Sequence, residues 1–393
     1  MTKDAKYWSE WFWDSFFVDW LDRVIDDHGG VFDALDVDGK PDLGSGKTLL
    51  AQARTLFTLS HVAILSGDQG LVEIARKQAK FLENFQKSPG LYRSKVNRNG
   101  SPTRNSEDEI ARSYDQTFVI LGLVTWNKVS PSNEVSTLIN DCWDALVTKL
   151  TDPASGLLFN DDSGLNSGPA QNPHMHLYEA CLQAFRMTQE AIWLTRAADL
   201  RKVGLRYFLD ETSGSITEFL TCNLAPLEGA AGQRREIGHQ CEWAWLLLEE
   251  ADLTNDTSLV GTAKRLIAFS DNFGFADDCV VTGAAFDAVS ACGQTVDERF
   301  LLWPQTEAIK VLSTRHKARE PFVGGRAQRL FCLVFERWFA NRPFFCNQLD
   351  LGGNSLWDET LTRLMYHLVL AVSEGSKAGL WPDIPAKILK RSI

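Results

Sequence analysis

Apolar residues recur at helical spacing along most of the chain, and polar residues fill the positions between them. The first segment shows the pattern clearly, with Trp8, Trp11, Phe12, Phe16 and Trp20 on one side and acidic residues between them. A repeat near 3.6 residues is typical of amphipathic helices. It predicts helices over residues 7–25, 48–65, 69–85, 110–126, 133–150, 174–188, 192–208, 236–248, 257–270, 299–312, 326–339 and 361–372. Strand patterns are confined to short pieces of the connections, so the sequence predicts an all-α fold.

The connections between these helices alternate in length. Long connectors rich in Gly, Asp and Ser tend to precede each even-numbered helix, and the link from that helix to the next is short. Such alternation indicates stacked helical hairpins. Six hairpins from about twelve helices can close into an (α/α)6 barrel. No shift in composition marks a boundary, so we expect residues 1–393 to form a single barrel domain.

Composition narrows the classes of partner. The net charge of −11 disfavours nucleic acid and anionic membrane surfaces. We find no apolar stretch near the roughly 18–20 residues needed to cross a bilayer, and the first residues lack the layout of a signal peptide. The eight cysteines are scattered without C-x-x-C spacing, which is typical of reduced thiols. The sequence thus predicts a cytoplasmic protein that binds a small molecule.

One stretch, EIGHQCEWAWLLL over residues 236–248, carries candidate chemistry. His239 and Glu242 are three residues apart, so on a helix they share a face. A histidine within reach of a glutamate is a simple proton-transfer device near neutral pH. The same pair also occurs as a buried structural couple, so the stretch alone leaves both interpretations open.

The polar residues set in apolar helical segments strengthen the functional interpretation. All of them fall on even-numbered helices, most near the N-terminal end: Arg54, Tyr114, Asp115, His176, Glu179, His239, Glu242, Trp303, Glu307 and His367. If the even-numbered helices form the inner ring of a barrel, these side chains meet at one mouth. Structural histidines scattered along the chain would not be restricted to the even-numbered helices.

Two further motifs suggest a metal site or a phosphate-binding loop, but the spacing of their residues does not fit either one. His174 and His176 form H-x-H, yet positions i and i+2 of a helix point about 200° apart, and no Cys/His cluster completes a metal shell. We therefore predict no metal. LGSGKTLL over residues 43–50 resembles a phosphate loop, but Pro41 occupies the position of its first glycine. We expect a flexible loop there, with Lys47 and Thr48 opening the next helix.

Several segments together resemble the N-acylglucosamine 2-epimerase superfamily of (α/α)6-barrel enzymes, most of all its mannose isomerase and sulfoquinovose isomerase subgroup. In order, they are QARTLFTLSHVA, YDQTFVILGL, NPHMHLYEA, EIGHQCEWAWLL, LLWPQTEAIK and YHLVLA. The resemblance implies that His239 and His367 are an acid/base pair. It implies that sugar-binding residues come from Arg54, His176 and Glu242, and that the pocket lining includes Asn172, Glu179, Trp303 and Glu307. We place Tyr114 in the same substrate-binding set.

The chain departs from the family pattern in two places. The approach to the last histidine reads TRLMYHL, where the family has polar or proline-flanked residues. The tryptophan often found after Gly-Gly is replaced in GGNSLW. Both changes fall at the end of the pocket that could select the substrate.

The resemblance implies an aldose–ketose isomerase, and we favour interconversion of D-mannose and D-fructose through an enediol, with histidines moving the protons and no cofactor. A mannose, N-acylglucosamine or cellobiose 2-epimerase is the close alternative. Two other classes stay open: an (α/α)6 glycoside hydrolase with two carboxylates, and a non-catalytic sugar-binding protein. Oligomeric state is not readable from the sequence, and a homodimer is one option.

Overall fold

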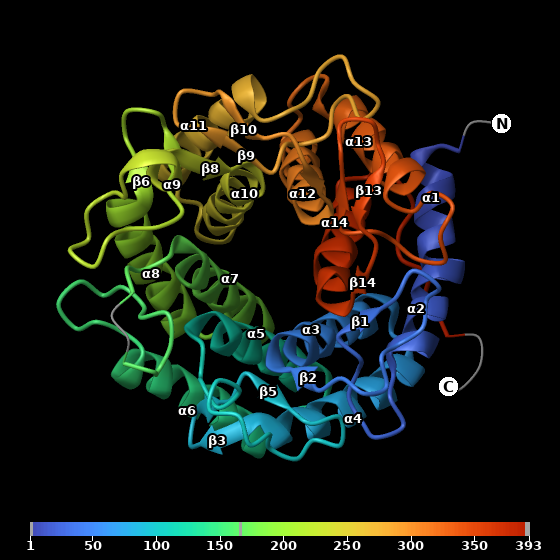
Figure 1. The fold of residues 1–393 in the computed structure, drawn as a ribbon, viewed down its shortest axis with the longest axis vertical. Helices are drawn as coiled ribbons and strands as arrows, with labels where there is room; N and C mark the ends of the chain where they lie inside the picture. Colours follow the sequence, from blue (N-terminus) through green and yellow to red (C-terminus); the bar gives the residue numbers. More distant parts are fainter. Residues whose placement is uncertain (1–2, 165–166, 390–393) are drawn as a thin grey trace.

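The helices of the computed structural model, which describes residues 3–164 and 167–389, close into two concentric rings (Figure 1). The inner ring consists of α3 (Leu49–Ser66), α5 (Ser113–Val129), α7 (Gln171–Thr188), α10 (Ile237–Thr254), α12 (Leu302–Lys317) and α14 (Met365–Lys377). The outer ring consists of α1 (Ala5–Trp11), which continues through a π-helical segment (Phe12–Phe16) into α2 (Phe17–Val24), and of α4 (Gln69–Leu82), α6 (Asn133–Lys149), α8 (Ala191–Phe208), α11 (Ser258–Phe273) and α13 (Val323–Arg337). Each inner helix contacts both of its neighbours, and α14 closes the ring against α3. The predicted (α/α)6 barrel is confirmed.

Burial differs between the rings for a geometric reason. An inner helix meets two ring neighbours and an outer helix, so α3 is buried around almost its whole circumference. The outer helix α4 buries only one stripe, which includes Leu71, Ala75 and Leu82. By length and apolar composition alone α3 could cross a membrane, but 83% of it is buried inside the protein. This is the usual state of a core helix in a protein of this size.

Helix boundaries differ from the predicted ones where a helix follows a short strand. The tenth predicted helix begins at residue 299 and the twelfth at 361, whereas α12 begins at Leu302 and α14 at Met365. The residues just before them form β11 (Phe300–Leu301), β14 (Thr360–Leu361) and a 3-10 turn (Thr362–Leu364). Apolar residues run through both strand and helix, so periodicity does not locate the junction. The short helix α9 (Gly229–Gln233) is too brief to show a period and was not predicted.

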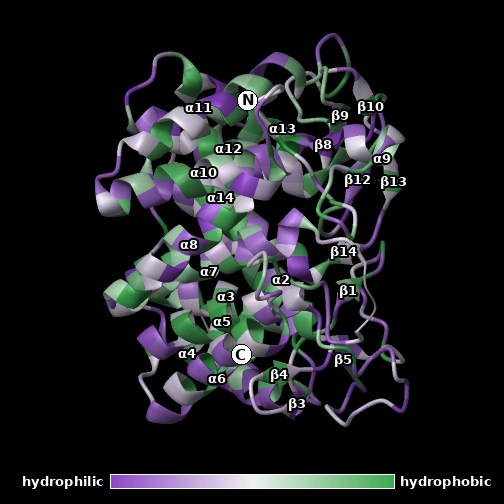
Figure 2. Ribbon diagram, turned by 90° about the vertical axis from the view of Figure 1, so that its left-hand side faces the viewer, coloured by the Kyte–Doolittle hydropathy of each residue, from purple (hydrophilic) through white to green (hydrophobic). Residues whose placement is uncertain are grey.

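Most of the short strands in the long connections gather at one side of the barrel, on the right in Figure 2. Antiparallel pairs join β1 (Ala34–Leu35) to β14, β2 (Lys47–Thr48) to β5 (Lys95–Val96), β3 (Gln86–Ser88) to β4 (Leu91–Tyr92), and β6 (Leu209–Asp210) to β7 (Ser215–Ile216). Two three-stranded sheets consist of β8 (Arg234–Glu236), β9 (Ala288–Ser290) and β10 (Thr295–Asp297), and of β11, β12 (Gln348–Leu349) and β13 (Ser355–Trp357). The β1–β14 pair joins the first connection to the last.

Buried glutamines tie these connections to the inner helices. On α10, the Gln240 side chain accepts a hydrogen bond from the Ile216 backbone N–H at 2.6 Å and donates to the same residue's carbonyl at 3.0 Å. The amide thus pairs with the loop backbone as a neighbouring strand would. Three more inner helices repeat this two-way bond, with pairs Gln52–Val31, Gln116–Tyr92 and Gln305–Ala285. Each glutamine lies within two residues of a predicted site residue, so it holds a connection over the barrel mouth.

The connection before α3 is not the flexible loop that the sequence suggested. The Lys47 ammonium is fully buried, lies 2.7 Å from an Asp26 carboxylate oxygen and donates to the Gly29 carbonyl. Asp26 also accepts two hydrogen bonds from Arg98 at 2.8 Å. Thr48 does open the helix as expected, because its hydroxyl caps α3 at the Ala51 N–H. Lys47 therefore has a structural role.

The hydrogen bonds of the buried glutamines should contribute measurably to the free energy of unfolding. Gln240→Leu leaves the buried N–H and C=O of Ile216 without partners, and each such group costs about 1–3 kcal/mol. We expect a loss of that order or more in the free energy of unfolding, measured by chemical denaturation. Gln86→Leu, at an exposed glutamine, is the matched control. Equal stability of the two variants would contradict the role of the buried amide.

Candidate active site

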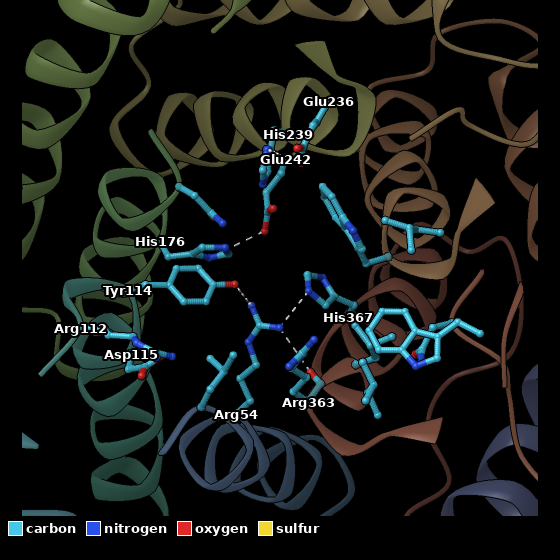
Figure 3. A pocket seen from close by; sticks show the side chains of 18 residues that line it. Arg54, Arg112, Tyr114, Asp115, His176, Glu236, His239, Glu242, Arg363 and His367 are labelled. Carbon is cyan, nitrogen blue, oxygen red and sulfur yellow. Dashed lines mark hydrogen bonds and ion pairs between the residues drawn. The ribbon is translucent and has the colours of Figure 1, made fainter. Parts of the chain in front are cut away.

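A cavity of about 430 Å³ opens at the N-terminal ends of the inner helices (Figure 3). Its size falls in the range of small-molecule sites. The lining combines charged, polar and apolar side chains: Leu50, Arg54, Arg112, Tyr114, Asp115, Asn172, His176, Glu236, His239, Glu242, Leu301, Trp303, Asn347, Trp357, Leu361, Arg363, Leu364 and His367. Every inner helix contributes at least one of the predicted site residues. The restriction of the polar residues to even-numbered predicted helices therefore reflects the convergence of these side chains on one cavity.

Eight of the ten predicted site residues line this cavity, and the two exceptions are Glu179 and Glu307. We expected both to line it, but each lies behind a histidine. Glu179 accepts a hydrogen bond from the His176 Nδ1 at 2.8 Å and another from the Tyr366 hydroxyl. Glu307 lies 2.8 Å from the His367 Nδ1. These carboxylates sit deeper in the barrel, where they orient imidazoles rather than face a ligand.

The imidazole of His239 lies between two acids from the connection before α10. Its Nδ1 is 2.7 Å from Glu218 and 3.2 Å from Glu236. Burial lowers the pKa of His239, but the two carboxylates more than offset it and raise the pKa to about 10. His239 is therefore a cation at neutral pH. The pairing of His239 with Glu242 expected from their spacing is wrong, since Glu242 lies instead 3.7 Å from Lys310 and 4.0 Å from His176.

His367 has the opposite protonation state. Its Nε2 lies 3.2 Å from Nη1 of Arg54, and a guanidinium can only donate, so Nε2 must accept. The ring proton is thus on Nδ1, which donates to Glu307. Burial, then the charges of Arg54 and Lys310, lower the pKa of His367 well below 6.5. The residue is a neutral imidazole whose lone pair faces Arg54.

The indole of Trp303 contacts both of these histidines. Its ring centroid lies 4.8 Å from that of His239 and 6.1 Å from that of His367. Gly238, next to His239, makes room for the indole, since an added Cβ there would lie 2.2 Å from the Trp303 ring. Trp303 therefore fixes the spacing of the two imidazoles and offers an apolar surface beside them.

Lys310 is the buried charge behind the cavity that sequence reasoning missed most clearly. Its ammonium is fully buried, 2.5 Å from Glu307 and 3.9 Å from the centre of the Trp245 ring. Burial and Glu242 raise the pKa of Glu307 well above 4.5, and Lys310 opposes this. One signal was available, because a lysine three residues after Glu307 stands inside an apolar helical segment. Glu218 gave no such signal, since it lies in a connection without periodicity.

Several buried polar atoms of the cavity have no hydrogen-bond partner within residues 3–164 and 167–389. They include Oδ1 of Asn172 and both carboxylate oxygens of Glu242. Buried polar atoms cost free energy unless they are bonded, and the hydroxyl groups of a sugar would satisfy them. Tyr114 is already engaged, because its hydroxyl accepts from Arg54 at 2.7 Å.

Among the residues that the structure describes, three clusters could offer metal ligands: His176–Glu179–Glu242, Glu218–Glu236–His239 and Glu242–Glu307–His367. Each contains a histidine whose Nδ1 already faces a carboxylate. Lys310 also places a positive charge beside Glu242 and Glu307. The H-x-H pair does not converge, as its geometry predicted. His174 instead faces α8 and contacts the Leu200 carbonyl at 2.7 Å through Nε2, and burial lowers its pKa to about 4.

Comparison with known proteins identifies relatives across most of the chain. The model of the N-acylglucosamine 2-epimerase family matches residues 30–341. A mannose-6-phosphate isomerase of Rhizobium meliloti is 28% identical over 93% of this chain and 94% of its own. A cellobiose 2-epimerase of Bacteroides fragilis is 23% identical over 74% and 76%. The crystal structure of a D-mannose isomerase superposes with a TM-score of 0.82 at 20% identity, covering 95% of this chain and 98% of that one.

The acids around His239 predict how its charge depends on pH. Removal of one carboxylate by Glu218→Gln should lower the pKa of His239 from about 10 by roughly one to three pH units, as followed by NMR of the ring protons. A raised pKa in the folded state stabilises the fold fully below about pH 6.5, and this stabilisation is lost as pH rises toward about 10. Glu228→Gln, at an exposed acid, should change neither. An unchanged titration in Glu218→Gln would refute the assignment.

Lys310 should contribute most to the stability of the fold at pH values where Glu307 and Glu242 are ionised. Lys310→Met leaves Glu307 and Glu242 as buried carboxylates without their cation, which costs about 3–5 kcal/mol in comparable cases. We expect this loss of unfolding free energy at pH 8 and a smaller one at pH 5, where Glu307 protonates readily. Lys264→Met, at an exposed lysine of α11, should change stability by less than about 0.5 kcal/mol. A loss independent of pH would count against the ion-pair explanation.

Proposed function

The chain belongs to the N-acylglucosamine 2-epimerase family of sugar epimerases and isomerases, and on that premise we propose that it is an aldose–ketose isomerase. The aldose and ketose that it would interconvert are D-mannose and D-fructose. The observation that carries the proposal is the pair of imidazoles in one cavity with opposite protonation states. His367 is neutral and can accept a proton, and His239 is charged and can donate one.

The chemistry requires both functions. Of the hydrogens bound to carbon in the open-chain form of an aldose, only the one on C2 is acidic, because it lies next to the C1 carbonyl. Arg54 would turn from the His367 Nε2 to the sugar oxygen, where it would stabilise the negative charge that develops, and the freed Nε2 lone pair of His367 would remove the C2 proton. One such donor commonly contributes about 2.7–4 kcal/mol. His239 would supply a proton to O1 and take one from O2, and His367 would return its proton to C1, which gives the ketose.

The similarities to a mannose-6-phosphate isomerase and a D-mannose isomerase support a mannose-type substrate. The unpartnered oxygen atoms of Asn172 and Glu242 support a polyhydroxylated ligand. The Trp303 indole supports it too, since flat apolar ring faces commonly receive sugars.

A 2-epimerase is the second candidate, and one observation favours it. His239 is protonated in the same cavity as the base His367, so a second proton donor, which inversion at C2 requires, is available. The product then would be the C2 epimer, glucose in the case of mannose. The likeness to a cellobiose 2-epimerase agrees with this alternative.

Asparagine variants of the two histidines test the proposal. His239→Asn and His367→Asn should each lower kcat with D-mannose by about 100-fold or more, since a positioned acid or base contributes about 10²–10⁴-fold. Proton NMR in heavy water identifies the product, with fructose indicating an isomerase and glucose an epimerase. His28→Asn, at an exposed histidine, should retain activity. Turnover retained in both site variants would refute the mechanism, and binding of mannose without turnover by the wild type would indicate a binding protein.

A further inference from the structure

The ammonium group of Lys310 lies between two carboxylates in the interior of the barrel. Its Nζ is 2.5 Å from Oε2 of Glu307 and 3.7 Å from Oε1 of Glu242. All three side chains are buried. Lys310 lies behind the cavity rather than in its lining. Any effect of Lys310 on a bound sugar must therefore act through these two acids.

Glu242 and Glu307 are too close to remain two anions without a cation between them. Carboxylate oxygens of the two residues lie within 4.8 Å of each other. Two like charges at such a distance favour uptake of a proton by one of them. Burial and then Glu242 raise the pKa of Glu307 well above 4.5, and Lys310 opposes both effects. Lys310 is thus the charge that favours the carboxylate form of Glu307.

The other charged and titratable groups around this cluster come from four inner helices. They are His239, Cys241 and Glu242 of α10, Tyr366 and His367 of α14, His176 and Glu179 of α7, and Arg54 of α3. The outer helix α13 also packs on α12, but its buried residues are apolar or glycine. Among the residues that the structure describes, Lys310 is the only lysine or arginine within 4.0 Å of a Glu307 carboxylate oxygen.

The ionisation state of Glu307 affects how readily His367 can act as a base. Oε1 of Glu307 lies 2.8 Å from Nδ1 of His367, which carries the ring proton. When Nε2 takes the proton from C2, Nδ1 keeps its own proton and the buried ring becomes a cation. A carboxylate at 2.8 Å offsets this new charge, whereas a neutral carboxylic acid does not.

We propose that Lys310 is a positioning residue for the proton transfer: it keeps Glu307 ionised beside Glu242, so that Glu307 stabilises the imidazolium that His367 becomes. This proposal rests on the proposed isomerase function and adds a residue that touches neither the sugar nor His367. The C–H electron pair stays on the sugar as the enediolate, the proton passes to Nε2, and neither Glu307 nor Lys310 gains or loses a proton in the step.

The pH dependence of kcat with D-mannose tests this role. Without Lys310 the pKa of Glu307 should rise by about one to three pH units, so Lys310→Met should be about 10- to 1,000-fold slower than the wild type at acidic pH. The deficit should shrink as the pH rises toward about 9, where His239 is still charged, and KM should change little. Lys264→Met, at an exposed lysine, should keep the wild-type profile. A deficit equal at all pH values would indicate a merely structural role and overturn the proposal.

Infrared spectroscopy separates failure of this proposal from failure of the isomerase function, because protonated and ionised carboxyl groups absorb at different frequencies. The band that Glu307→Gln removes belongs to Glu307. Its titration should move up by about one to three pH units in Lys310→Met, even if no sugar is turned over. An unchanged titration overturns the proposal even if mannose is isomerised.

A second pair of variants covers the case in which Lys310→Met does not fold. Glu242→Gln removes the competing carboxylate, so the double variant Lys310→Met/Glu242→Gln buries fewer unpaired charges than Lys310→Met alone. The infrared titration of Glu307 should again lie at higher pH in the double variant than in Glu242→Gln, by at least about one pH unit. Identical titrations in these two variants would overturn the proposal.

Discussion

Two-way hydrogen bonds between buried glutamine amides and the loop backbone are the constraint on which the rest of this structure depends. The inner helices alone would present only their N-terminal ends to solvent. Gln240 fixes Ile216, and with it the connection that brings Glu218 to His239. Gln52 fixes Val31 in the first connection. The β1–β14 pair joins this connection to the last one. Because a buried backbone group without a partner costs free energy, these bonds permit little freedom at the cavity mouth.

The fixed connections create two different electrostatic environments for the same side chain. Two carboxylates from the connection before α10 surround His239 and keep it charged. Arg54 and Lys310 act on His367 from the barrel interior and keep it neutral. Environments that separate the pKa values of two titratable groups assign one as acid and the other as base.

The sequence was informative where physical effects are local. Helical periodicity identified the twelve long helices because burial of one helix face repeats every 3.6 residues. The restriction of the polar residues to even-numbered helices identified eight cavity residues, because these helices form the inner ring and surround the cavity. It failed for Glu179 and Glu307, which share helices with cavity residues but lie behind histidines. It also failed for the strand-to-helix junctions, where apolar residues continue through both structures.

The sequence by itself determined the barrel and the alternation of inner and outer helices, and it identified three imidazoles, Arg54 and the Trp303 indole among the side chains that reach the cavity. Only the tertiary structure decided what each of them touches. His239 obtains its carboxylate from a residue 21 positions away, His367 from one 60 positions away, and Arg54 meets His367 across 313 positions. The protonation states follow from these contacts, because charge interactions depend on distance in space and on burial. Neither quantity is encoded in the spacing of residues along a single helix.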